Sequence, residues 1–137
     1  MSVVVYNAQG VKLFCLMDVF GGERMEPARS HELTMLLDFY GALLTEKQHE
    51  MMRLRVEEDL SLSEIADGFG VSRQAVHDAL RKAEKTLTDM EEKLHLVEKY
   101  RLLHQKARLA MAALEDQDTD RAKQLLMEMQ KEGMYGV

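Results

Sequence analysis

Along most of the chain, apolar residues recur at steps of three and four, the spacing that places them on one face of an α-helix. The first such run begins near Ala28 and places on one side Leu33, Leu36, Leu37, Tyr40 and Leu44. A second helix is predicted from about Thr45 to Glu58. The Thr45 side chain can accept a hydrogen bond from a backbone amide of the next turn, and the Gln48 side chain can reach back to the backbone amide of Thr45. This pattern indicates where the helix starts.

The region from Ser61 onward predicts a short third helix and a long fourth one. Ser61 and Glu64 repeat the same capping pattern, and the residues expected to be buried behind them are Ile65, Ala66 and Phe69. Gly70 follows at a point where a left-handed backbone is usual. Ser72 caps a fourth helix that begins at Arg73 and meets no helix breaker for many residues, so we expect it to be long.

The third and fourth helices are predicted to form a helix-turn-helix unit over residues 62–81. Two crossed helices need apolar residues at matching positions to form a shared core, and the residues at those positions are Ile65, Phe69, Val71 and Val76. Ala66 is small at the point where the second helix crosses the first, and Gly70 lies in the turn between them. These agreeing positions indicate a helix-turn-helix more strongly than any other motif in the chain.

Beyond residue 96 the apolar positions follow the alternating steps of four and three that are typical of a coiled-coil seam. They are Leu96, Tyr100, Leu103, Ala107, Ala110 and Leu114. A polar turn at residues 115–120 leads into a last helix with an apolar face of Ala122, Leu125, Leu126 and Met129. The predicted fold is therefore all-α: a four-helix helix-turn-helix domain with a long fourth helix and a C-terminal helical hairpin.

We divide the chain into three regions on this pattern. Residues 1–27 are expected to be a weakly ordered N-terminal arm with a short strand at residues 3–6. Residues 28–90 are expected to form the helix-turn-helix domain. Residues 91–137 are interpreted as a helical extension that joins two copies of the chain, because helix-turn-helix units usually read paired half-sites as homodimers.

Composition supports the helical prediction and narrows the class of protein. The chain has one proline and eight glycines in 137 residues. Its single cysteine, Cys15, excludes an internal disulfide and a cysteine-rich zinc site, which favours a cytoplasmic location. No apolar run reaches the roughly 18 to 20 residues that span a bilayer, so we expect no membrane insertion.

The sequence offers no catalytic grouping, and we expect neither an enzyme nor a bound metal or cofactor. The five histidines stand apart from one another, and there is no glycine-rich phosphate loop. Glu92 and His95 have the spacing used in di-iron helix bundles, but such a site needs a second copy of the motif and the chain has none.

The start of the predicted fourth helix is the candidate binding surface, because the second helix of a helix-turn-helix enters the DNA major groove. The residues expected to contact DNA are Ser72, Arg73, Gln74, His77, Arg81, Lys82 and Lys85. Arg73 can donate to guanine and Gln74 can pair with adenine. Ser72 and the helix N-terminus can bind a phosphate, and the two lysines are expected to contact the DNA backbone.

The overall charge of the chain opposes DNA binding. The net charge is −6, which is unfavourable for holding a polyanion. Residues 72–87 nevertheless contain four basic and two acidic side chains, which gives a weak basic stripe of +2. A weak stripe within an acidic chain is also typical of a protein that binds another protein.

Several strings in the chain resemble the YlxM family, whose members are regarded as DNA-binding helix-turn-helix proteins. They are LLDFYGALLTEKQ at 36–48, DLSLSEIA at 59–66, VSRQAV at 71–76 and EEKL at 91–94. The resemblance covers about residues 33–114, and the four-helix segment is also similar to the promoter-reading region 4 of bacterial sigma factors. Genes of this family typically neighbour those of the signal recognition particle GTPases. The resemblance therefore implies a bacterial protein with an accessory or regulatory role in that protein-export pathway.

Two functional hypotheses stay open at this point. In the first, the chain is a DNA-binding regulatory protein that takes part in the signal recognition particle pathway. In the second, it is a protein- or RNA-binding accessory of the signal recognition particle without specific DNA binding. The helix-turn-helix pattern favours the first, and the acidic net charge favours the second.

Overall fold

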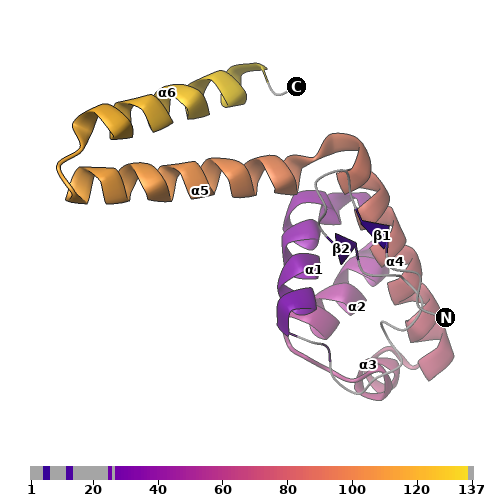
Figure 1. Cartoon of the computed structure of the whole chain (residues 1–137). Helices are drawn as coiled ribbons and strands as arrows, with labels where there is room; N and C mark the ends of the chain where they lie inside the picture. The colour runs from indigo at the N-terminus through magenta and orange to yellow at the C-terminus, as the bar shows by residue number, and fades with distance from the viewer. Residues whose placement is uncertain (1–4, 7–11, 14–24, 26, 136–137) are drawn as a thin grey trace. The chain divides into compact units, whose positions relative to one another are not determined.

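The computed structural model describes residues 5–6, 12–13, 25 and 27–135. Within them the chain forms α1 (Pro27–Tyr40), α2 (Glu46–Val56), α3 (Leu62–Phe69), α4 (Arg73–Leu94), α5 (Leu96–Glu115) and α6 (Thr119–Tyr135) (Figure 1). A short 3-10 helix, η1 (Gly41–Leu43), follows α1, and the two-residue strands β1 (Val5–Tyr6) and β2 (Lys12–Leu13) pair antiparallel. The predicted all-α fold, with its helix-turn-helix, long fourth helix and C-terminal hairpin, is confirmed.

The chain divides into two compact units, Met1–Lys93 and Leu94–Val137. We call them the helix-turn-helix unit and the hairpin unit, and we describe each by itself. Of the predicted N-terminal arm, the described residues include the β1–β2 pair, so part of the strand expected at residues 3–6 is present. Residues 3 and 4 and Cys15 lie outside the described residues.

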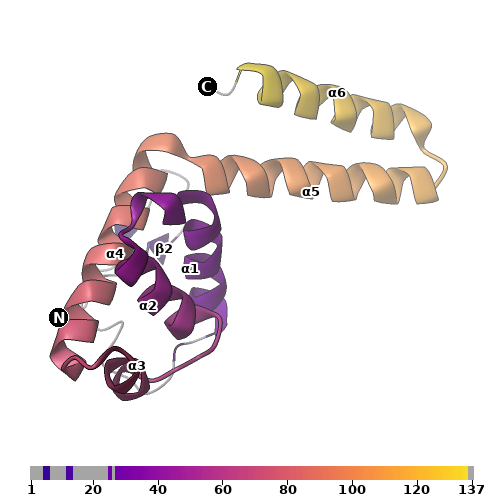
Figure 2. The same cartoon turned by 180° about the vertical axis from the view of Figure 1, so that it is seen from behind.

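The core of the helix-turn-helix unit lies between α1, α2 and α4, with α3 at one end (Figures 1 and 2). Its buried apolar side chains come from all four helices: Leu33, Leu36, Leu37, Tyr40, Met51, Met52, Val56, Leu62, Ile65, Ala66, Val76, Leu80, Ala83 and Leu87. Three residues predicted on this side are only half-buried, and one of them is Val71, in the turn between α3 and α4. Leu44 follows η1, where the helical spacing has ended, and Phe69 lies at the end of α3, with Lys47 Nζ 5.9 Å from its ring centroid.

Both predicted capping boxes are present, and they explain where α2 and α3 begin. Thr45 Oγ1 accepts from the Gln48 amide at 3.2 Å, and Gln48 Oε1 accepts from the Thr45 amide at 3.2 Å. In α3 the Glu64 amide donates to Ser61 Oγ at 3.2 Å and the Ser61 amide donates to Glu64 Oε2 at 2.8 Å. These hydrogen bonds satisfy amides that have no partner inside the helix.

Buried polar pairs tie α1 to α4, and the sequence pattern did not predict them. The Arg29 guanidinium forms an ion pair with the buried Glu84 carboxylate, and the Tyr40 hydroxyl donates to Glu91 Oε2 at 2.5 Å. Burial raises the pKa of Glu84, and the nearby Arg29 charge opposes that rise. Because each pair joins residues more than 50 positions apart, the pairs fix how α4 lies against the rest of its unit.

The hairpin unit consists of α5 and α6 packed antiparallel, and its interior is built mainly from small residues. The buried positions that face across the hairpin are Ala110, Ala113, Ala122 and Leu125. The turn is closed by the Asp118 amide, which donates to the Ala113 carbonyl at 2.8 Å, while Asp118 Oδ1 accepts from the Arg121 amide at 3.0 Å.

Within one chain, α6 covers only part of the predicted seam along α5. Ala110 is buried as expected, but three of the six predicted positions, Leu96, Tyr100 and Leu114, are exposed. The physical reason is that α6 packs against the alanine side of α5, which also includes Ala113. The larger side chains of the seam lie to one side of that contact.

Candidate nucleic-acid interface

The turn between α3 and α4 fixes the direction in which α4 leaves the helix-turn-helix. Gly70 ends α3 with φ 62° and ψ 37°, a left-handed conformation that costs glycine little and other residues about 1 kcal/mol or more. The Val71 amide donates to the Ala66 carbonyl at 3.1 Å, which closes the turn. Ser72 Oγ then accepts from the Ala75 amide at 3.1 Å, so Ser72 caps α4 as predicted.

One side of α4 is anchored in the core, and this leaves the opposite side for contacts with a partner. Val76, Leu80, Ala83 and Leu87 are fully buried and follow one another at steps of four, three and four. Six of the seven predicted site residues are exposed, at the start of the helix or on its outer side: Ser72, Arg73, Gln74, Arg81, Lys82 and Lys85. The seventh, His77, is partly exposed. All seven thus belong to α4 or its cap and are accessible.

A carboxylate that the sequence analysis did not include lies among these residues. Asp78 Oδ1 accepts a hydrogen bond from Gln74 Nε2 at 3.0 Å and lies 3.5 Å from His77 Nδ1. The signal for it was present, because Gln74 and Asp78 are four residues apart and so are neighbours on a helix. The amide of Gln74 therefore has a partner within α4 that it must exchange when it hydrogen-bonds to a base.

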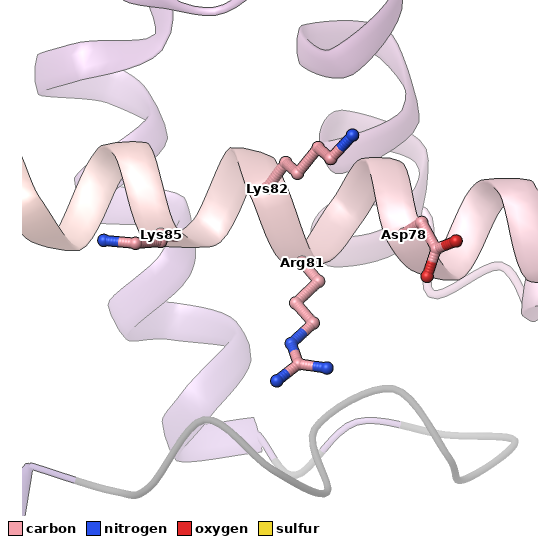
Figure 3. Close-up of a pocket in the computed structure, with 4 residues that line it drawn as sticks. All are labelled: Asp78, Arg81, Lys82 and Lys85. Carbon is pink, nitrogen blue, oxygen red and sulfur yellow. The ribbon is translucent and has the colours of Figure 1, made fainter.

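The basic residues are spaced along the helix and do not converge on one point. Arg81, Lys82, Lys85 and Asp78 line a shallow surface pocket of about 420 Å³ (Figure 3). In Figure 3 the Arg81 and Lys82 side chains extend from opposite sides of α4, and Lys85 lies further along the helix. Such a spread suits successive phosphates of a nucleic-acid backbone better than one small ligand.

The three cations nearest the start of α4 are available for an external anion. Within the described part of the chain, no carboxylate lies within 4.0 Å of the charged nitrogens of Arg73, Arg81 or Lys82. Lys85 differs, because its Nζ is 2.7 Å from Asp89 Oδ2 and this hydrogen bond raises the pKa of Lys85.

The net negative charge of the protein comes from the unit that contains this surface. Residues 1–93 have 17 acidic and 11 basic side chains, a net of −6, whereas residues 94–137 have seven of each. Binding of a polyanion is therefore supported by the local stripe on α4 and opposed by the rest of its unit.

The described residues offer neither a metal site nor a membrane span. None of them forms a group of three or more histidine, cysteine, aspartate or glutamate side chains that could hold a metal ion. No described helix combines the length and the apolar character needed to cross a membrane.

Comparison with known proteins places this architecture in context. Residues 28–131 match the family model UPF0122, described as "Putative helix-turn-helix protein, YlxM / p13 like", so the match extends from α1 into α6. A UPF0122 protein of Desulforamulus reducens is 56% identical over 70 residues, which are 51% of this chain and 60% of that relative. UPF0122 proteins of Latilactobacillus sakei and Streptococcus gordonii are 50% and 47% identical over 76 residues, 56% of this chain and 67% and 69% of theirs. The match to the first relative thus spans less than two thirds of that protein.

Proposed function

The chain belongs to the UPF0122 family of helix-turn-helix proteins, and we propose that it is a DNA-binding regulatory protein that inserts α4 into the major groove. The observation that carries this proposal is the two-sided character of α4. Its apolar side is fully buried, and the seven predicted residues from Ser72 to Lys85 are at least partly exposed at its start and on its outer side. A helix anchored in this way presents polar side chains on a rigid support, which is what base reading requires.

Each residue has a distinct role in this proposal. Arg73 and Gln74, in the first turn, read base edges, because arginine pairs well with guanine and glutamine with adenine. His77 and Arg81 continue the same side of the helix one and two turns later. Ser72, Lys82 and Lys85 contact the phosphate backbone and set the register of the protein on the duplex.

The proposal includes two further elements that come from the sequence analysis. The first is a homodimer, which would supply two α4 helices for paired half-sites. The second is a role in the signal recognition particle pathway, supported only by the sequence resemblance to the YlxM family.

The direct experiment compares two double variants in selection from a pool of random-sequence DNA duplexes. The wild type should enrich a defined sequence, and Arg73→Ala with Gln74→Ala should weaken binding to that sequence about tenfold or more, since each lost base contact costs about 1–3 kcal/mol. The matched control is Arg121→Ala with Gln124→Ala, which removes an exposed arginine and glutamine from α6. Equal enrichment by the wild type and the Arg73/Gln74 variant would contradict the proposed role of α4.

A second candidate function is favoured by the charge of the helix-turn-helix unit. With a net charge of −6 that unit repels phosphate outside the α4 stripe, whereas an acidic surface can bind a basic protein. In this alternative the chain is a protein- or RNA-binding accessory of the signal recognition particle without specific DNA binding, and the charge favours the protein-binding form because it opposes RNA as it opposes DNA. Selection that recovers no preferred DNA sequence, together with binding to the purified particle, would support it.

A further inference from the structure

Large apolar side chains are distributed very unevenly between the two units. Among the described residues, eleven large apolar side chains are more than a third exposed, and nine of them belong to residues 94–137. The hairpin unit is also the smaller of the two. Single exposed apolar residues are ordinary on a protein surface, but a concentration of this kind marks a surface that another molecule covers.

The hairpin places its small residues inside and its large residues outside. Ala110 and Ala113 of α5 meet Ala122 of α6 in the interior, and the larger buried apolar side chains of this unit are Leu125 and, near the start of α5, Val97. Alanines let the two helix axes approach closely, so larger side chains next to them are left on the flanks of the contact. An isolated hairpin gains little from this arrangement, because burial of large apolar side chains is what stabilises helix packing.

The two flanks of the hairpin differ in chemistry. On one flank Lys106 of α5 forms ion pairs with Glu128 and Glu132 of α6, and these pairs cover that side of the contact. The same flank of α5 carries Leu102 and Leu109, which precede Lys106 and the buried Ala113 by four residues. This side is therefore a mixture of apolar and charged groups.

The opposite flank carries exposed apolar residues from both helices, with the exposed Lys123 and Gln130 beside them on α6. Met111 and Leu114 follow Ala107 and the buried Ala110 by four residues, and Leu126 follows the buried Ala122 by four. A step of four residues rotates the side chain by about 40° in the same sense on each helix, so in an antiparallel pair these three residues lie on one flank. They are 64%, 54% and 51% exposed. We call Met111, Leu114 and Leu126 the apolar flank.

The size of the hairpin suits a second hairpin as the occupant of this flank. The 20 residues of α5 extend about 30 Å at 1.5 Å per residue. Two helices side by side, each about 10 Å in diameter, give a face of about 600 Å². Stable protein interfaces bury about 800 Å² on each partner, so one face of the hairpin has nearly the area that a dimer needs.

Charge complementarity also favours self-association. The hairpin unit has equal numbers of acidic and basic side chains, so two hairpins do not repel each other as two helix-turn-helix units do. Exposed Arg108 and Glu115 lie beside the apolar flank, two helical turns apart and opposite in charge. In a two-fold arrangement of antiparallel α5 helices, Arg108 of one copy faces Glu115 of the partner subunit.

We propose that a second copy of this chain docks on the apolar flank, so that two α5–α6 hairpins form a four-helix bundle around Met111, Leu114 and Leu126. The proposal rests on the proposed function in one respect, since it names the surface of the homodimer that presents two α4 helices to DNA. The bundle places the large side chains of four helices in a shared interior, and the alanine contacts stay within each hairpin.

The test is the molar mass of the full-length protein by size-exclusion chromatography with light scattering. The wild type should be a dimer, and Met111→Glu with Leu114→Glu should be a monomer with unchanged helical content by circular dichroism. The matched control is Leu102→Glu with Leu109→Glu, which places the same charges on α5 side chains of similar exposure, 48% and 47%, on the other flank. The control should remain a dimer.

Two results would overturn the proposal: a wild type that is monomeric at all concentrations tested, or a control that dissociates as fully as the Met111/Leu114 variant. Leu126→Glu provides a second test from α6 if the double variant fails to fold, and it too should be monomeric. Mass does not depend on DNA, so the result is separable from the proposed function. A dimer that selects no DNA sequence would refute DNA reading only, and a monomer that selects one would refute the bundle only.

Discussion

The helix-turn-helix unit and the hairpin unit bury opposite kinds of side chain. The first buries leucine, methionine, isoleucine and valine between its helices, and only Phe39 and Leu43 are large apolar residues more than a third exposed among its described positions. The second buries mainly alanine and exposes leucine, methionine and tyrosine. The first unit therefore completes its own core, whereas the second has most of its large apolar side chains available for another molecule.

The two units also use charge differently. In the helix-turn-helix unit a buried ion pair, Arg29–Glu84, joins α1 to α4, and the buried Arg55 donates from Nη1 to the Leu60 carbonyl at 2.7 Å. The ion pairs of Lys106 in the hairpin lie on its surface. Removing one member of a buried ion pair lowers the free energy of unfolding much more than removing one member of a surface pair. The packing around α4 is therefore more tightly specified than the packing of the hairpin.

The largest expected effect comes from placing a charge in the core of the helix-turn-helix unit. Ile65 is 1% exposed, and Ile65→Asp buries a carboxylate with no provision for a partner. We expect the free energy of unfolding to fall by about 4 kcal/mol or more, which is a large part of the roughly 5–15 kcal/mol typical of a domain. Urea unfolding measures the change. Leu43→Asp, at an exposed position of the same unit, is the control and should shift the free energy of unfolding by no more than about 0.5 kcal/mol.

A smaller effect on the free energy of unfolding is expected from Glu84 as pH changes. Burial raises the pKa of Glu84 above its ordinary 4.5, so the Glu84 carboxyl holds its proton more tightly in the folded state than in the unfolded state. This tighter proton binding stabilises the folded state fully at pH values below the ordinary pKa. The stabilisation is lost as pH rises through the pKa of Glu84 in the folded protein. Glu84→Gln removes this loss, and its stability relative to the wild type should therefore increase with pH.

Urea midpoints of the wild type and Glu84→Gln across the acidic to neutral range would measure this trend. Glu92→Gln, an exposed position of the same helix, is the control and should show a much flatter difference. A relative stability of Glu84→Gln that falls as pH rises would mean that the Arg29 charge outweighs burial at this site.

The elements of the fold were predictable because their signals are local. The capping boxes at Thr45 and Ser61 and the left-handed Gly70 involve residues within a few positions of one another, and all three are confirmed. The position of the break between α4 and α5 was not predicted. It occurs at His95, which has φ 53°, and no glycine or proline marks it. Nothing in the local pattern distinguishes this position from its helical neighbours.

What the sequence analysis missed depends on contacts between distant residues. The burial of Arg55 and the Arg29–Glu84 pair arises from packing of helices, and periodicity assigns charged residues to the surface by default. On α5 the pattern identified an apolar stripe but not which part of it α6 would cover. At the candidate site, the exposed face of α4 followed from the spacing of its core residues. The Gln74–Asp78 hydrogen bond was not predicted, although the two residues are four positions apart on one helix. The contacts of that face with DNA stay a prediction.

The most direct test of α4 as a DNA-reading helix is the binding of purified full-length protein, at two salt concentrations, to genomic DNA fragments and to the reconstituted signal recognition particle with its RNA. The account predicts tight DNA binding that selects particular fragments and weakens steeply as salt increases, because the cations of α4 displace counterions from phosphates. Weak and unselective DNA binding beside firm association with the particle would contradict it.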